Sequence, residues 1–137
     1  MSFADDFCEI QNLKARYCAA ADRAPEDRED ALRQLRGVFA ADVTCDYGFD
    51  RPIEGGEALA AFLSDVIAGN SEWIIHNAHS PLIEIDGGRA TGRWTVIARM
   101  KRCGSGEIDT VVGRYADRFL REDGTWKIGH IAFQRYE

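Results

Sequence analysis

The sequence lacks any long apolar run, and this absence excludes a membrane-spanning protein. No hydrophobic stretch approaches the roughly 20 residues that a helix needs to cross a bilayer. The first residues, MSFADDFCEI, carry acids where a signal peptide has a basic segment followed by an apolar one. We therefore expect a cytoplasmic protein with no membrane partner.

Positive charge is also scarce. The chain has 17 lysines and arginines against 23 aspartates and glutamates, which gives a formal net charge of −6. Binding to nucleic acid depends on a concentrated basic surface that contacts phosphates. The local basic run ARMKRC, residues 98–103, is soon followed by the acidic segment GEIDT. We expect no nucleic-acid partner.

Motifs for metals and nucleotide cofactors are missing as well. The cysteines are Cys8, Cys18, Cys45 and Cys103, and they form no CxxC pair and no zinc-finger spacing. In a cytoplasmic protein such thiols are expected to be reduced and to pack mostly as small apolar groups. No G-x-G-x-x-G motif follows a predicted strand. We expect neither a metal nor a cofactor.

What the sequence does contain is the composition of one ordinary globular domain. It has 137 residues, of which 45% are hydrophobic and 29% are charged. We treat residues 1–137 as a single domain. Helical periodicity dominates the first half and strand-like alternation the second half, which indicates an α+β fold.

Three amphipathic helices are predicted. The first covers about residues 4–21, where apolar side chains recur at spacings of three and four. The second follows a turn that contains Pro25 and a candidate N-cap at Asp27, and it carries Leu32, Leu35 and Phe39. The third begins after Gly55-Gly56 and stops near Gly69.

Strands account for most of the rest. A short strand is predicted over residues 42–48, and from residue 72 onward the pattern is an antiparallel sheet. WIIHNAH and LIEI are strand-like, and longer strands follow over residues 89–102, 108–121 and 125–136. The turns are predicted at IDGGR, CGSGE and Asp123-Gly124. Helices that cover one face of a curved sheet leave a conical interior in which a pocket can form.

The order of these segments resembles the nuclear transport factor 2-like superfamily, and in particular its SnoaL-like branch. The matching segments are LKARYCAAADR, VFAADVTCDYG, EGGEALAAFL, the stretch from His76 to IEIDGGRATGRW, and GRYADRFLREDGTWKIGH. The resemblance covers nearly the whole chain. It implies three N-terminal helices on a strongly curved mixed or antiparallel sheet that forms a cone with an interior pocket. It also implies association through the sheet face, as a homodimer or homotrimer.

Two dehydratase families supply candidate catalytic residues through this resemblance. The chain is similar to scytalone dehydratases at Asp22, His76 and Tyr47, and to bile-acid dehydratases at Tyr17, Asp22 and His76. Other positions differ from these families. The second histidine of scytalone dehydratases falls on Trp94, their helix-end tyrosine on Ala21 and their late-strand asparagine near Tyr115, while Arg99 occupies the place of the extra strand acid of bile-acid dehydratases. A substrate other than theirs is therefore expected.

Ketosteroid isomerases offer a weaker comparison. Tyr17 matches their oxyanion-holding tyrosine, but their catalytic carboxylate falls on Tyr47. The neighbouring Asp46 points to the opposite face of the strand. The dehydratase interpretation is preferred.

The resemblance implies a specific division of roles. His76 would be the general acid and base, since imidazole titrates near neutral pH. Asp22 would orient His76, and Tyr17 with Tyr47 would bind the substrate oxygen. A structural alternative stays open for each, because a helix-end acid is often only solvated and a tyrosine in an apolar stripe often only packs. In an ideal helix Tyr17 and Asp22 lie about 140° apart.

Four further residues are candidates for the wall of the pocket: Trp94, Tyr115, Phe119 and His130. Trp94, Tyr115 and Phe119 are in phase on two neighbouring strands, and an apolar, aromatic wall suits a flat hydrophobic ligand. An ordinary core without a cavity is the alternative.

The functional prediction is a cofactor-free lyase of the dehydratase type acting on a hydrophobic hydroxy-carbonyl, aromatic or polycyclic small molecule. An isomerase or polyketide cyclase is one rival, because this fold hosts several chemistries. A non-catalytic binder of an apolar ligand and a purely structural dimer module are the others.

Overall fold

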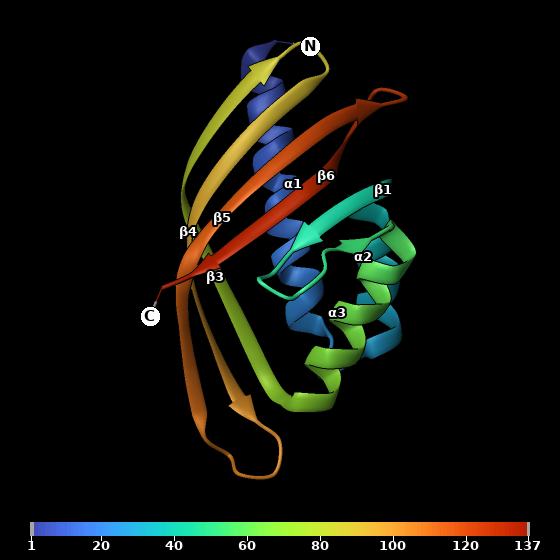
Figure 1. Cartoon of the computed structure of the whole chain (residues 1–137). Coiled ribbons are helices and arrows are strands. Elements are labelled where there is room, and N and C mark those ends of the chain that lie inside the picture. Colours follow the sequence, from blue (N-terminus) through green and yellow to red (C-terminus); the bar gives the residue numbers. More distant parts are fainter. Residues whose placement is uncertain (1, 137) are drawn as a thin grey trace.

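A computed structural model describes residues 2–136. Its elements are α1 (Phe3–Arg23), α2 (Arg28–Val38), β1 (Phe39–Asp46), β2 (Ile53–Glu54), α3 (Gly56–Asn70), β3 (Ser71–Asp86), β4 (Arg89–Arg102), β5 (Ile108–Glu122) and β6 (Thr125–Arg135). Figure 1 shows a curved sheet with all three helices on one side of it. No helix among the described residues is long and apolar enough to cross a membrane.

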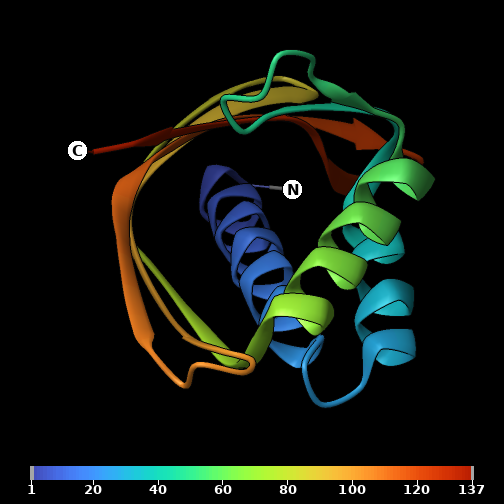
Figure 2. The ribbon, with the colours of Figure 1, turned by 60° about the horizontal axis from the view of Figure 1, so that its bottom comes forward.

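The sheet has six strands in the order β2-β1-β6-β5-β4-β3. All neighbouring strands are antiparallel except β1 and β6, which are parallel. Seen from the direction of Figure 2, the long strands bend around α1, so the helix lies in the concave side of the sheet. This architecture confirms the predicted α+β fold with three helices on a strongly curved mixed sheet.

Several predicted elements have different bounds in the structure, and the short strand β2 was not predicted. β1 ends at Asp46, so Tyr47 and Gly48, which were predicted in this strand, lie outside it. Phe39 begins β1 instead of ending the second helix, because the chain is already extended at this residue. WIIHNAH and LIEI belong to one continuous strand, β3. Its register with β4 shifts between His79 and Leu82, and Ser80 between them has a positive φ of 54°. The shift bends a single strand, which explains why the sequence shows two separate alternating segments.

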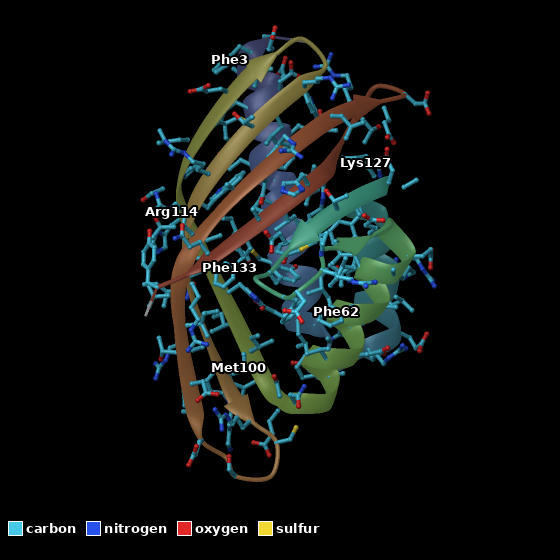
Figure 3. The ribbon with its side chains drawn as sticks, in the orientation of Figure 1. Phe3, Phe62, Met100, Arg114, Lys127 and Phe133 are labelled. Atoms are coloured by element: carbon cyan, nitrogen blue, oxygen red, sulfur yellow. The ribbon has the colours of Figure 1, made fainter. Side chains whose placement is uncertain are left out.

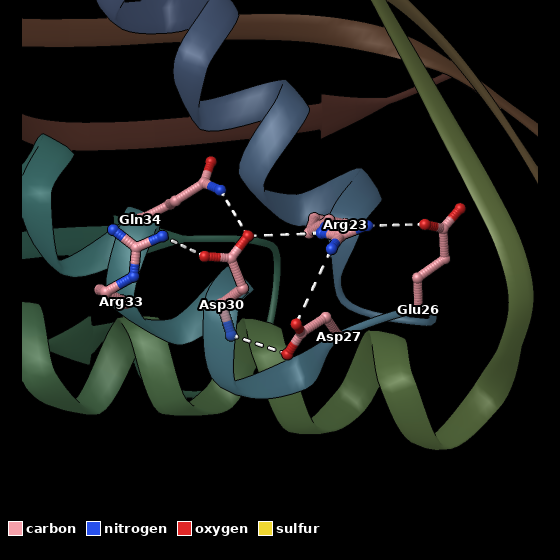
Figure 4. A network of polar contacts seen from close by, with 6 residues as sticks. All are labelled: Arg23, Glu26, Asp27, Asp30, Arg33 and Gln34. Atoms are coloured by element: carbon pink, nitrogen blue, oxygen red, sulfur yellow. Dashed lines mark hydrogen bonds and ion pairs between the residues drawn. The ribbon is translucent and has the colours of Figure 1, made fainter.

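The ends of α1 and α2 are held by short-range polar contacts. Ser2 and Asp5 form a capping box at the start of α1. The predicted cap of α2 is confirmed, since Asp27 accepts a hydrogen bond of 3.1 Å from the backbone N–H of Asp30. Figure 4 shows that Arg23, the last residue of α1, contacts Glu26, Asp27 and Asp30. These contacts fix the turn that follows Asp22.

The core lies between α1 and the concave face of the sheet. One stripe of α1 is buried there, and its apolar members are Ile10, Leu13, Tyr17, Cys18 and Ala21. The other end of α1 is anchored by Asp6, whose carboxylate accepts hydrogen bonds from Trp126 Nε1 (3.0 Å) and from Arg121 (2.6 Å). This end of the helix is thereby held against the sheet, while Arg23 ties the other end to the turn and to α2.

Candidate active site

The structure brings Asp22 and His76 into direct contact. Asp22 lies in the last turn of α1 and His76 near the start of β3, 54 residues later in the chain. The imidazole Nδ1 is 2.6 Å from Asp22 Oδ1, and the backbone N–H of His76 donates to Asp22 Oδ2 at 3.2 Å. An ionised carboxylate only accepts, so Nδ1 carries the proton of the shorter bond. Nε2 is then the ring nitrogen available to a ligand.

The phase of β3 directs His76 toward the helices. Ile74 is buried and Ala78 is partly buried on the same face, whereas Trp73 and Ile75 on the other face are 40% and 47% exposed. The His76 side chain is only 12% exposed. This alternation is the one that period-2 strand geometry predicts.

A groove of about 680 Å³ runs between α1 and β3 beside this pair. Residues from α1, β3 and β4 line it: Gln11, Lys14, Ala15, Cys18, Ala19, Asp22, Ile75, His76, Asn77, Ala78, His79, Ser80, Pro81 and Trp94. Trp94 is 3% exposed, so it lies at the bottom of the groove. Another hollow, of about 590 Å³, is lined in part by Phe119 but by neither member of the Asp22–His76 pair.

Tyr17 and Tyr47 form a second pair, with their hydroxyl oxygens 2.6 Å apart. Neither is among the residues that line the groove. Tyr17 points from a different side of α1 than Asp22, as the helical spacing predicts. Burial raises the pKa of both hydroxyls, although part of the Tyr47 side chain is exposed. Both tyrosines therefore stay protonated at neutral pH, and one hydroxyl donates to the other.

The three aromatic residues predicted for the pocket wall lie on the concave face, but only Trp94 lines the groove. Trp94 and Tyr115 are directly opposite each other on β4 and β5. Trp94 also contacts Phe119 edge to face, with ring centroids 5.9 Å apart, and Tyr115 contacts Tyr17 at the same separation. Trp94 lines the groove, whereas Tyr115 and Phe119 pack beneath it as core.

His130 lies on the convex side of the sheet, away from the groove. In the pairing of β5 with β6, Arg118 is opposite His130 and Phe119 is opposite Ile128. Gly129 therefore has no partner of its own on β5 and is the extra residue of a bulge. Without this shift His130 would share the buried face of Ile128. Its Nδ1 is 2.6 Å from Thr44 Oγ1. Partial burial lowers its pKa, and Arg118 adds to this effect.

A buried ion pair, Lys14 with Asp117, was not anticipated from the sequence. Lys14 Nζ lies 2.7 Å from Asp117 Oδ2, and both side chains are almost fully inaccessible. The signals were present in the sequence. Lys14 follows the spacing of the buried stripe of α1, and Asp117 alternates in phase with Tyr115 and Phe119. A charged residue within an apolar phase is the pattern that would have revealed both.

The two buried cysteines, Cys18 and Cys45, have thiols with raised pKa values. Cys18 lines the groove, and burial raises the pKa of its thiol to about 11. Burial likewise raises the pKa of Cys45 to about 12. Both thiols therefore carry little thiolate at neutral pH, which disfavours a nucleophilic role. Within residues 2–136, no three His, Cys, Asp or Glu side chains cluster as metal ligands would.

Comparison with known families decides the classification. A family model described as SnoaL-like domain matches residues 3–132. The chain belongs to this SnoaL-like family. No curated protein matches the sequence significantly.

Several solved structures share the SnoaL-like fold. A protein of Novosphingobium aromaticivorans DSM 12444, proposed to be a scytalone dehydratase, is 18% identical, with a TM-score of 0.87 over 98% of this chain and 86% of that one. The LinA-type3 hexachlorocyclohexane dehydrochlorinase of Novosphingobium barchaimii LL02 is 15% identical, with a TM-score of 0.83 over 98% and 88%. A point variant of Rv3472 of Mycobacterium tuberculosis, a protein of unknown function, is 26% identical, with a TM-score of 0.81 over 96% and 77%.

Proposed function

We propose that this protein is a lyase of the dehydratase type that uses the His76–Asp22 pair as its proton-transfer group. The observation that carries this proposal is the double contact between Asp22 and His76 at the side of a groove. A carboxylate that accepts from Nδ1 fixes the tautomer in which Nε2 has a free lone pair. Relatives of the same fold, a proposed dehydratase and a dehydrochlorinase, are described as elimination enzymes.

The reaction follows from the chemistry of imidazole. His76 Nε2 removes the proton next to the substrate carbonyl, and the electron pair of that bond moves toward the carbonyl oxygen as an enolate. The imidazolium then returns the proton to the β-hydroxyl. The carbon–oxygen bond breaks, a carbon–carbon double bond forms, and water leaves. Asp22 stabilises the imidazolium between these two steps.

The tyrosine pair is the proposed ligand of the carbonyl oxygen. Only one of its two hydroxyl hydrogens lies between the oxygens, so the other hydroxyl can donate to a ligand. A preorganised donor that meets developing negative charge is worth about 10²–10³ in rate. Because neither tyrosine lines the groove, a substrate that used both pairs would have to extend beyond the groove lining.

The proposed substrate is a flat, hydrophobic hydroxy-carbonyl compound with an aromatic or polycyclic skeleton. Trp94 at the bottom of the groove offers an aromatic surface, and the small side chains of Ala15, Ala19 and Ala78 leave room beside it. The groove lining mixes apolar side chains with polar ones, and polar groups orient the ligand in small-molecule sites.

A panel of aromatic β-hydroxy ketones tests the proposal. Loss of water is followed by mass spectrometry for the wild type, His76→Gln and Asp22→Asn. His130→Gln is the matched control, because His130 lies on the convex face and contacts Thr44. We expect turnover by the wild type and the control, with a loss of about 10²–10⁴ in His76→Gln. Unchanged turnover in His76→Gln would refute the proposal.

A further inference from the structure

Lys14 is a buried cation held by one carboxylate and two aromatic rings. Its Nζ lies 2.7 Å from Asp117 Oδ2, 3.5 Å from the centroid of the Tyr115 ring and 4.2 Å from that of Tyr17. Burying a charge is costly unless the charge is paired, and the ring faces add cation–π stabilisation. The proton-transfer chemistry proposed above makes no use of this cation.

Lys14 nevertheless lines the same groove as the catalytic pair. Lys14, Cys18 and Asp22 are spaced by four residues, so they lie along one side of α1. At 1.5 Å per residue, the Cα atoms of Lys14 and Asp22 are separated by about 12 Å along the helix axis. Trp94 lies at the Lys14 end, with its ring centroid 5.8 Å from Nζ. The groove thus has a reactive end at His76 and a cationic end at Lys14.

Lys14 retains unused hydrogen-bonding capacity. An ammonium group has three N–H donors, and among the described residues the one carboxylate oxygen that pairs with Nζ is Asp117 Oδ2. Nζ itself is buried, so it has no water to fill the remaining donors. Aromatic faces stabilise the charge but are weaker acceptors than an oxygen lone pair. Because Asp117 already balances the charge of Lys14, an anionic ligand would meet a repelling carboxylate. A neutral oxygen fits this environment better.

We propose that Lys14 binds a neutral oxygen substituent, a phenolic hydroxyl or a ketone, at the end of the substrate remote from His76. The inference rests on the proposed use of this groove as the substrate site. It narrows the substrate class to elongated flat molecules that carry one oxygen function near the reacting carbon and a second at the far end. Lys14 is a specificity-determining residue in this scheme.

NMR of the wild-type protein tests this contact without any substitution in the core. The sequence contains only three lysines, Lys14, Lys101 and Lys127. Their ¹³Cε signals can be assigned with Lys101→Arg and Lys127→Arg, which change lysines outside the groove. Adding 2-naphthol should shift the Lys14 signal and leave the other two in place, whereas naphthalene should shift it less. Equal shifts for 2-naphthol and naphthalene, or no shift of the Lys14 signal, would overturn the inference.

Calorimetric affinities provide the second test. The variant Lys14→Met/Asp117→Asn removes both charges of the pair together and keeps similar side-chain shapes. In the wild type, 2-naphthol should bind about 10-fold more tightly than naphthalene, because a hydrogen bond to a charged donor is gained. 2-Naphthoate should bind more weakly than 2-naphthol. The preference for the hydroxyl should disappear in the double variant, and its persistence there would contradict a role for Lys14.

The His76→Gln variant separates this inference from the proposed function. It should lose turnover yet keep the preference for 2-naphthol, since the two contacts are at opposite ends of the groove. If turnover depends on His76 while the hydroxyl preference is independent of Lys14, the proposed function stands and the inference about Lys14 fails. If the preference depends on Lys14 but turnover is independent of His76, the groove binds such ligands without the proposed chemistry.

Discussion

Asp22 accepts two hydrogen bonds from a single residue, His76. One carboxylate oxygen receives the imidazole Nδ1–H at 2.6 Å, and the other receives the backbone N–H at 3.2 Å. This arrangement joins the C-terminal turn of α1 to β3 and sets the rotation of the imidazole ring at the same time. Asp22 therefore positions His76 in two independent ways.

Asp22→Asn should disturb this pair more than an isosteric change usually does. An amide has one acceptor oxygen, so its NH₂ group would face one of the two N–H donors of His76. We expect ¹⁵N NMR to show His76 protonated at Nδ1 in the wild type when its ring is neutral, and a mixture of tautomers in Asp22→Asn. His130 provides an internal reference, because it lies on the convex face and its Nδ1 contacts Thr44. An unchanged His76 tautomer in the variant would contradict the role assigned to Asp22.

Tyr17→Phe and Tyr47→Phe test whether the two tyrosines bind the substrate carbonyl oxygen or only pack in the core. Each variant removes one hydroxyl of the pair and leaves its ring in place. If the pair binds the substrate carbonyl, kcat should fall about 10²–10³-fold in at least one variant. If the tyrosines only pack, kcat should hold and only the melting temperature should fall. Steady-state kinetics and thermal unfolding on the same samples separate the two results.

Lys14→Met should destabilise the fold by about 3–5 kcal/mol, because it leaves the buried carboxylate of Asp117 without its partner. Burial raises the pKa of Asp117 above its ordinary value of 3.8. The folded chain then binds this proton more tightly than the unfolded chain, so the stability of Lys14→Met should rise as the pH falls through the raised pKa. Urea unfolding across this range checks the sign. Lys14→Met/Asp117→Asn should recover much of the loss and lack the pH dependence.

Asp6→Asn should show the opposite dependence on pH. The hydrogen bond from Trp126 Nε1 lowers the pKa of Asp6, and Arg121 adds to the effect. The stabilisation of the fold by the ionised Asp6 carboxylate is therefore complete above the ordinary pKa of 3.8. It is lost as the pH falls toward the lowered pKa of Asp6 in the folded chain. The variant should be less stable than the wild type at neutral pH, and the difference should shrink on acidification. Thermal unfolding followed by tryptophan fluorescence measures it. A difference that stays constant with pH would contradict the ionised contact.

The convex face of the sheet is the proposed surface for a homodimer or homotrimer. Exposed apolar side chains gather there on neighbouring strands, namely Ile75, Ile97 and Val112. Figure 3 shows Arg114 projecting on this side, away from the helices. Ile97→Glu should shift the protein toward monomer in sedimentation at micromolar concentration. Val66→Glu is the control on α3, where Val66 is similarly exposed. A wild-type monomer would refute this surface.

The local pattern of the sequence was sufficient for most elements. Period-2 alternation and Gly-rich turns predicted β4 at residues 89–102, and Asp27 was predicted as the cap of α2. The face of His76 followed from the same alternation. These features depend on a few neighbouring residues, because strand phase and helix capping are set by local backbone geometry.

Register shifts and long-range pairing were decided only by the tertiary structure. The bulge at Gly129 turned His130 to the convex face, and the bend near Ser80 joined two segments into one strand. The partner of Lys14 is 103 residues away in the chain, at Asp117. The sequence by itself determined the family, most of the elements and the face of His76. Only the packing of α1 into the curved sheet determined which ionisable side chains come into contact. Each contact between α1 and the sheet depends on the summed curvature and register of several strands.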